Sequence, residues 1–191
     1  MRWMLKAGVV TAALLAMTGG VTAQPVPSGE EGELTKFLPP VPGTRICFSR
    51  LYDAEHLKAH PKQKVTELEF RLSYYRHPPA EDLPKGQNNY YFALFAKLRG
   101  SSEKLQSFGE CTPSGDAIAC MVECDGGGIQ VKRRPDKKVL VYFAADIGRI
   151  RMAGCDGDEE GDSVDLTPGA DDREFLLSKT PDAECPAYDD W

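Results

Sequence analysis

From residue 45 onward, apolar and polar residues alternate along this chain, and that period of two limits what the chain can fold into. The segment 66–74 shows it most clearly, because every second residue is large and apolar (Leu68, Phe70, Leu72 and Tyr74). The residues between them are charged or carry a hydroxyl group. Alternation of this kind predicts a β-strand with one buried face and one face in water.

The segment 90–98 repeats the pattern but is also apolar at Tyr91, Ala93 and Phe95 on its second face, so we expect it to be buried on both sides. The other predicted strands are 45–52, 104–111, 117–124, 129–133, 139–144, 149–155, 163–167 and 174–178. Turn sequences rich in Pro, Gly and Asp separate them. We therefore predict an all-β fold of antiparallel strands in a barrel-like or two-sheet sandwich arrangement, and the successive hairpins between residues 90 and 155 favour the barrel.

Six cysteines, an even number, predict that disulfides brace this fold. They are Cys47, Cys111, Cys120, Cys124, Cys155 and Cys185. Cys120 and Cys124 fall on one face of the predicted strand 117–124, about 13 Å apart at roughly 3.3 Å per residue, which is beyond disulfide reach. A tight turn at 115–116 places Cys111 opposite Cys120. Cys47 and Cys185 lie near the two ends of the folded region, which leaves Cys124 for Cys155.

The first 23 residues have the composition of a cleavable export signal. Arg2 and Lys6 precede a short apolar stretch at 7–17, and small residues stand at Val21 and Ala23 before the expected cleavage point. An exported chain folds where thiols oxidise, so the cysteines are expected to be structural and the location periplasmic or secreted. No transmembrane anchor is expected after cleavage.

Proline and glycine are concentrated in residues 24–44, which predicts a linker of extended backbone that is flexible until it docks. The expected organisation is a signal peptide at 1–23, this linker at 24–44 and a single β domain at 45–191. The formal net charge of −6 argues against general nucleic-acid binding, because phosphate backbones require a basic surface.

The sharpest polar cluster in the sequence is Asp53, His56 and His60. On a helical turn the two histidines are four residues apart and share one face, so with Asp53 they could hold zinc or copper. The alternative is a short turn that Asp53 caps and Pro61 ends. We favour the capped turn, because a lone HxxxH without a third downstream ligand is a weak signal.

An acidic segment resembles the start of a calcium-binding loop, with oxygen ligands at alternate positions: Asp156, Asp158, Glu160 and Asp162. It lacks the glutamate that such a loop needs at its twelfth position, where Thr167 stands. A solvated acidic hairpin tip is the favoured interpretation, with weak calcium binding as the alternative.

Two further segments have a structural and a functional interpretation. The basic hairpin 132–138 could meet an anionic envelope component, although charged residues also keep a hairpin in solution and protect its edge. The run 125–128 contains three glycines but lacks the spacing of a phosphate-binding loop, so we expect a tight turn or bulge. No nucleophile elbow, HExxH or nucleotide-binding motif is present, so no catalytic residue is predicted.

Three stretches together resemble a family of small exported alphaproteobacterial proteins that has no assigned function. They are the motifs Tyr52-Asp53-x-x-His56-Leu57-x-x-His60-Pro61-x-Gln63-x-Val65-Thr66, Cys120-x-x-x-Cys124-Asp125-Gly126-Gly127-Gly128 and Asp171-Asp172-x-x-Phe175-x-Leu177 leading to Cys185. The resemblance spans most of residues 45–185. It implies an envelope location and no reaction.

These observations lead us to expect an exported, non-catalytic binding protein of the bacterial envelope that needs no cofactor. Its partner is expected to be an envelope component or another protein, and the loops at the ends of the barrel or sandwich offer a place for a ligand. One alternative is a metal-binding protein that uses Asp53, His56 and His60 with zinc or copper. Another is a lysozyme-inhibitor-like envelope protein, by analogy of architecture and location alone.

Overall fold

The computed structural model describes residues 25–81, 83–143, 148–154 and 163–190. Within these residues ten strands pair, all antiparallel. Their bounds are β1 Arg45–Leu51, β2 Val65–His77, β3 Gln87–Leu98, β4 Lys104–Ser114, β5 Ala117–Met121, β6 Gly128–Arg134, β7 Lys138–Tyr142, β8 Ile150–Gly154, β9 Val164–Leu166 and β10 Glu174–Lys179. The predicted all-β fold is confirmed, and each predicted strand has a counterpart.

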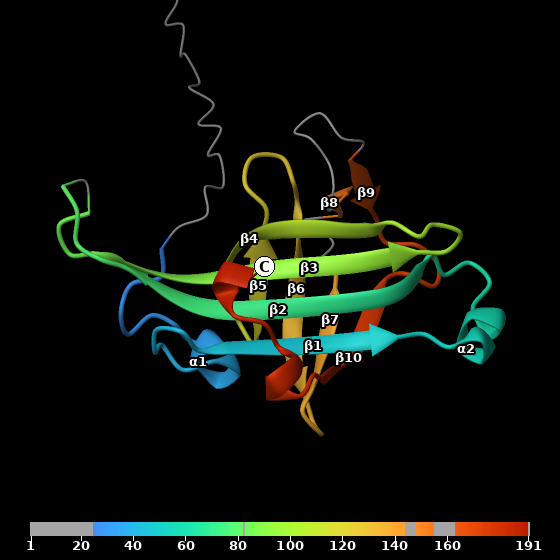
Figure 1. Cartoon of the computed structure of the whole chain (residues 1–191), viewed down its shortest axis with the longest axis horizontal. Helices are drawn as coiled ribbons and strands as arrows, with labels where there is room; N and C mark the ends of the chain where they lie inside the picture. Colours follow the sequence, from blue (N-terminus) through green and yellow to red (C-terminus); the bar gives the residue numbers. More distant parts are fainter. Residues whose placement is uncertain (1–24, 82, 144–147, 155–162, 191) are drawn as a thin grey trace, which may run out of the picture.

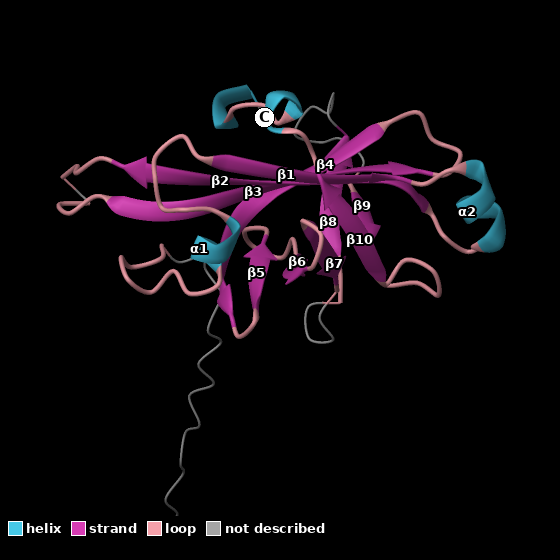
Figure 2. Cartoon of the chain, turned by 90° about the horizontal axis from the view of Figure 1, so that it is seen from below, coloured by secondary structure: helices cyan, strands magenta, loops and turns pink. Residues whose placement is uncertain are grey.

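Eight of these strands close into a barrel in the order β1-β2-β3-β4-β5-β6-β7-β10. Each strand up to β7 pairs with its neighbour in sequence, and β10 pairs with both β7 and β1. The long strands β1–β4 form one wall, and β5–β7 cross behind them (Figures 1 and 2). A closed barrel leaves none of these eight strands as a free edge, and of the two expected arrangements it is the barrel that forms.

Strands β8 and β9 extend the sheet beside β4. The first half of β4 pairs with β8 at Leu105 and Gln106, whereas its second half pairs with β5 from Glu110 to Ser114. Strand β4 is therefore part of both the barrel and the extension.

The barrel interior is filled by the apolar residues that the alternation predicts to point inward. The largest fully buried side chains include Tyr90, Phe70, Phe92, Phe175, Leu68, Leu72 and Leu94. The second face of β3 is also buried, as predicted, because Ala93 is 0% and Phe95 6% exposed. Phe95 lies on the outer wall, so something on that wall must cover it.

Residues of the Pro/Gly-rich segment pack onto the barrel. The helix α1 (Leu34–Phe37) buries Leu34 and Phe37 in the same core cluster as the strands, and Val26 donates its backbone N–H to the carbonyl of Asn88 at 3.1 Å. The described part of the segment therefore docks by contributing apolar side chains to the core. No helix among the described residues is both long and apolar enough to span a bilayer.

Two disulfides join cysteines of the described residues, and both have the expected pairing. Cys111 and Cys120 are direct cross-strand partners on β4 and β5, and Cys47 of β1 bonds Cys185. Cys124 is free and exposed, and its expected partner Cys155 lies outside the described residues.

The expected strand 117–124 is three residues too long, because β5 ends at Met121. The chain turns at once, with Cys124 at a φ of 57° and the amide of Val122 bonded to the carbonyl of Gly127. The assumption that Cys120 and Cys124 share one strand is therefore wrong. A positive φ is uncommon for a residue other than glycine and lies outside the β region, so the strand ends before Cys124.

The two disulfides are expected to differ in their contribution to stability, because they close loops of very different length. The bonded cysteines are 138 residues apart in one disulfide and 9 in the other. The Cys47→Ala/Cys185→Ala variant should lose about 5 kcal/mol of unfolding free energy and Cys111→Ala/Cys120→Ala about 3 kcal/mol, from loop-closure entropy in the unfolded chain. Urea unfolding measures both. All four cysteine side chains are buried, so the cavities that the substitutions leave should lower the unfolding free energy of the two variants by similar amounts. An equal or larger loss for the short loop would contradict this account.

Candidate functional site

The predicted metal residues lie at the helix α2 (Ala54–Ala59), at one end of the barrel. Asp53 caps this helix, since its Oδ1 accepts the backbone N–H of His56 at 2.7 Å. The rings of His56 and His60 stack with centroids 4.2 Å apart. The spacing therefore brought the two imidazoles together, as expected, and the capped turn is present.

Each of these histidines already has a hydrogen-bond partner in the protein. His56 Nε2 donates to Gln63 Oε1 at 2.9 Å, and His60 Nδ1 donates to the carbonyl of His56 at 2.9 Å. The nitrogen left for a metal is therefore Nδ1 on His56 but Nε2 on His60. Among the described residues, no group of three His, Cys, Asp or Glu side chains is placed to hold a metal ion.

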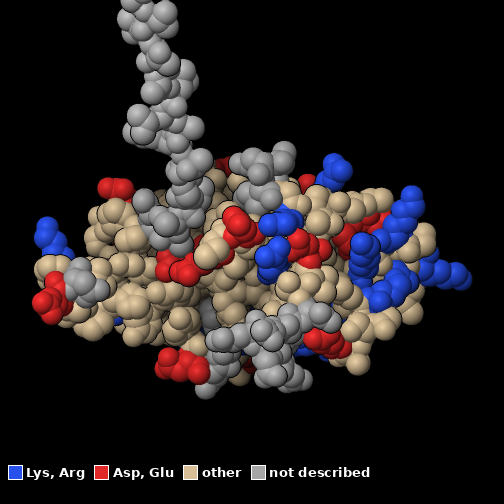
Figure 3. All heavy atoms as spheres, turned by 90° about the horizontal axis from the view of Figure 1, so that it is seen from above, with Lys and Arg blue, Asp and Glu red and all other residues tan. Residues whose placement is uncertain are grey.

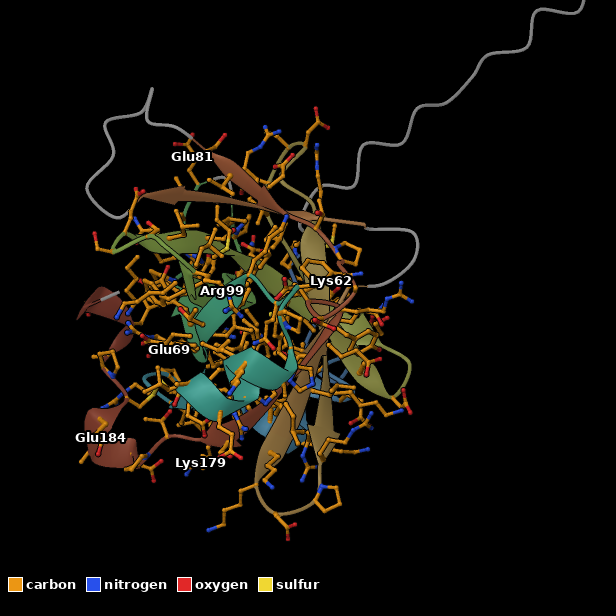
Figure 4. The ribbon with its side chains drawn as sticks, turned by 90° about the vertical axis from the view of Figure 1, so that its right-hand side faces the viewer. Lys62, Glu69, Glu81, Arg99, Lys179 and Glu184 are labelled. Atoms are coloured by element: carbon orange, nitrogen blue, oxygen red, sulfur yellow. A yellow bond between two sulfur atoms is a disulfide. The ribbon has the colours of Figure 1, made fainter. Side chains whose placement is uncertain are left out.

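Polar residues around α2 attach this end to the barrel. Asp172, 1% exposed, accepts the backbone N–H groups of Lys64 at 2.6 Å and Val65 at 3.1 Å. Arg99 donates to the carbonyls of Leu57, His60 and Gln63. Figure 4 looks onto this end and shows Arg99 beside α2. Several residues of the motifs that carry the family resemblance therefore stabilise this end of the fold.

Of the other three predicted segments, one lies outside the described residues and two lie within them. Asp156, Asp158, Glu160 and Asp162 lie outside the described residues. The glycine run forms a tight turn, as expected: the amide of Gly128 donates to the carbonyl of Arg149, and a Cβ on Gly127 would lie 2.1 Å from that oxygen. The basic hairpin joins β6 to β7, and its Lys132 forms an ion pair with Asp116.

An aromatic surface that the sequence analysis did not single out lies on the outer wall of β2, β3 and β4. We call it the aromatic face and define it by Tyr75, Tyr91, Phe108 and Tyr188. Tyr188 stacks on Tyr91 with centroids 5.3 Å apart and lies 5.7 Å from Tyr75. Phe108 is 41% and Tyr75 37% exposed. Exposed aromatic clusters of this kind are typical of interaction surfaces.

Tyr188 reaches this wall because the C-terminal segment crosses it. The Cys47–Cys185 disulfide holds the segment at β1, and the short helix η2 (Tyr188–Asp190) follows. Figures 1 and 2 both place the C-terminal segment on the side of β1–β3 that faces away from β5–β7. A depression of about 270 Å³ lies between Tyr91, Phe108 and Tyr188, with Phe92 and Gly109 also lining it.

Polar side chains accompany the rings. Tyr91 Oη lies 2.7 Å from His77 Nε2, and Asn89 Nδ2 donates to Glu110 Oε1 at 2.8 Å. Asn89 is 1% exposed, yet its Oδ1 has no hydrogen-bond partner among the described residues. A buried polar atom without a partner is uncommon in folded proteins and costs stability.

Burial shifts two acids of this surface. It raises the pKa of Glu110, and the negative charge of Glu123 adds to the rise, whereas the Asn89 amide and His77 oppose it. Burial, followed by the charge of Glu110, raises the pKa of Tyr91 to about 12. Both shifts have the same first cause, because burial removes water from the ionised form of each group.

The neighbouring part of the same wall pairs a ring with cations. Arg71 and Lys104 lie 4.3 and 4.4 Å from the ring centroid of Phe95, and they cover it. Glu69 bonds both, at 2.8 and 3.3 Å. Burial acts to raise the pKa of Glu69, but bonding to the two cations lowers it overall.

Charge is distributed unevenly over the surface. On the face seen in Figure 3, Lys and Arg side chains gather at the α2 end of the molecule, and Asp and Glu side chains are spread over its middle and its opposite end. Lys58, Lys62, Lys64 and Arg99 are exposed residues at the α2 end.

The aromatic face combines residues from four distant segments, which is why sequence reasoning missed it. The available signal was the apolar second face of the predicted strand 90–98, which carries Tyr91. Nothing in the sequence indicated that Tyr188 would lie against it.

No protein-family model, no curated protein and no solved structure matches this chain. The resemblance to exported alphaproteobacterial proteins therefore stays a prediction. Any function has to be argued from the geometry of the described residues.

His56→Ala is expected to lower the unfolding free energy by about 1–2 kcal/mol, because buried Gln63 Oε1 loses its donor. Thermal unfolding with and without equimolar Zn²⁺ should give the same loss. Lys58→Ala, on the exposed side of the same helix, serves as the control. A zinc-dependent rise in Tm that the wild type shows and His56→Ala lacks would support the metal hypothesis instead.

Glu110→Gln is expected to change how stability depends on pH. The folded-state pKa of Glu110 is raised, so its contribution is fully present below the unfolded-state pKa and is lost as the pH rises through the folded-state pKa. The stability of Glu110→Gln relative to wild type should therefore rise as the pH increases from about 4 toward neutrality. Urea unfolding across this range measures it. A difference that does not vary with pH would contradict the assignment.

Proposed function

We propose that this chain is an exported, non-catalytic binding protein of the bacterial envelope and that it holds its partner on the aromatic face. The observation that carries this proposal is the combination, on one outer wall, of exposed rings and a buried amide oxygen that has no hydrogen-bond partner among the described residues. Exposed aromatic rings supply large contact area at low entropic cost, and a binding partner that donates to Asn89 Oδ1 would satisfy it.

The packing of the barrel supports an outer-wall site. Phe70, Phe92, Tyr90 and Phe175 are fully buried among the core side chains. Small barrels are commonly filled in this way, and a filled barrel offers its partners its walls and loops. The wall that carries the aromatic face is also the wall that the C-terminal segment crosses.

Two observations support the envelope location. The described residues form two disulfides, and such bonds persist in oxidising compartments. Its first residues have the pattern of an export signal. We therefore place the protein in the periplasm or outside the cell.

Phe108→Ser tests the proposed surface, because it removes the most exposed ring of the aromatic face. Immobilised protein lacking residues 1–23 is exposed to a bacterial envelope extract, retained components are identified, and each is rebound in purified form. We expect the affinity of the specific partner to fall at least about tenfold in Phe108→Ser, as for a central aromatic contact.

Leu176→Ser is the matched control, since Leu176 on β10 is 42% exposed and lies outside the aromatic face. Equal loss in both variants, or in neither, would contradict the proposal. The lysozyme-inhibitor-like alternative is tested alongside it, and unchanged lysozyme activity at molar excess of the purified chain would exclude that alternative.

A further inference from the structure

The polar side chains beside the aromatic face, Asn89 and Glu110, favour a ligand that donates hydrogen bonds. Asn89 Oδ1 is an acceptor without a partner among the described residues, and ionised Glu110 can only accept. Glu123 adds negative charge beside Glu110, and Asp189 does so beside Tyr188. A ligand that carries donors and positive charge therefore suits this surface better than an anionic or acceptor-rich one.

The same wall already shows how this protein combines rings, carboxylates and cations. Phe95 lies under Arg71 and Lys104, with Glu69 bonded to both cations. The aromatic face repeats the ring and the carboxylate, as Tyr91 with Glu110. In the part of the chain that the structure describes, no Lys or Arg lies over the rings of Tyr91 or Phe108. His77 lies beside Tyr91, with its Nε2 2.7 Å from the hydroxyl, and a guanidinium or ammonium group over the ring would complete the arrangement.

The dimensions of the depression suit one side chain. Its volume of about 270 Å³ falls below the roughly 300–1,000 Å³ of typical small-molecule pockets. Phe92 and Gly109, which are register partners on β3 and β4, complete its lining. A guanidinium group is planar, stacks on aromatic rings and carries five donors, whereas an ammonium is a compact point charge. The geometry favours arginine.

We propose that the aromatic face binds an arginine side chain of a basic protein partner, with the guanidinium group between Tyr91 and Phe108 and its N–H groups directed to Asn89 and Glu110. This inference rests on the proposed function, since it names the chemistry of the partner at the same surface. The excess of acidic over basic residues in the whole chain favours approach of such a partner.

A set of peptides of equal length tests the inference on the folded protein. Hexa-arginine, hexa-lysine and hexa-glutamine are titrated by isothermal calorimetry and by NMR shift mapping. We expect hexa-arginine to bind tightest, hexa-lysine at least about threefold more weakly, and hexa-glutamine not measurably. Shifts should centre on Tyr91, Phe108 and Asn89.

Glu110→Gln and Glu174→Gln separate the site from general attraction, because each removes one negative charge from the outer surface of the barrel. We expect Glu110→Gln to weaken hexa-arginine binding about tenfold, equivalent to about 1.4 kcal/mol, and Glu174→Gln less than twofold. Thermal unfolding checks that both variants are folded.

The outcomes distinguish this inference from the proposed function. Equal effects of the two substitutions, or equal binding of hexa-glutamine, would overturn the arginine assignment, and the proposed function would stand if Phe108→Ser still weakened the envelope partner. If Phe108→Ser left both the partner and hexa-arginine unaffected, both proposals would be wrong.

Discussion

The pairing of β1 with β10 is the contact on which the rest of the structure depends. Phe48 pairs with Lys179 and Ser49 with Ser178, which joins strands from opposite ends of the domain. The disulfide between Cys47 and Cys185 lies beside this seam, and the amide of Thr180 donates to the carbonyl of Cys47 at 2.9 Å. Without the seam, β1 and β10 would be open edges and the apolar interior would be exposed.

Closure at this seam also determines the course of the C-terminal segment. Once Cys185 is held at β1, the last residues run across β2 and β3, and Tyr188 comes to lie on Tyr91. The proposed binding surface is therefore an outcome of barrel closure. Most of its rings and acceptors come from β2, β3 and β4, which pair as consecutive strands, and Tyr188 joins them from the segment that the seam holds at β1.

The two polar regions of the molecule differ in how fully their groups are satisfied. At the α2 end, Asp172, Arg99 and Gln63 each form side-chain hydrogen bonds with backbone groups. This cluster therefore stabilises the fold. At the aromatic face, Asn89 Oδ1 has no partner among the described residues, and burial raises the pKa of Glu110. Unsatisfied polar groups in a folded protein point to a ligand more strongly than satisfied ones do.

The sequence by itself determined the strands and their faces, because period-two alternation states which side chains can be buried together. It also identified the Cys111–Cys120 pair, since a tight turn brings near neighbours opposite each other, and it placed His56 and His60 on one face of α2. It did not reveal which hydrogen bonds occupy those histidines. Only the tertiary structure decided that the sheet closes as a barrel and that Tyr188 covers Tyr91, because both depend on contacts between residues far apart in the chain, on which local periodicity carries no information.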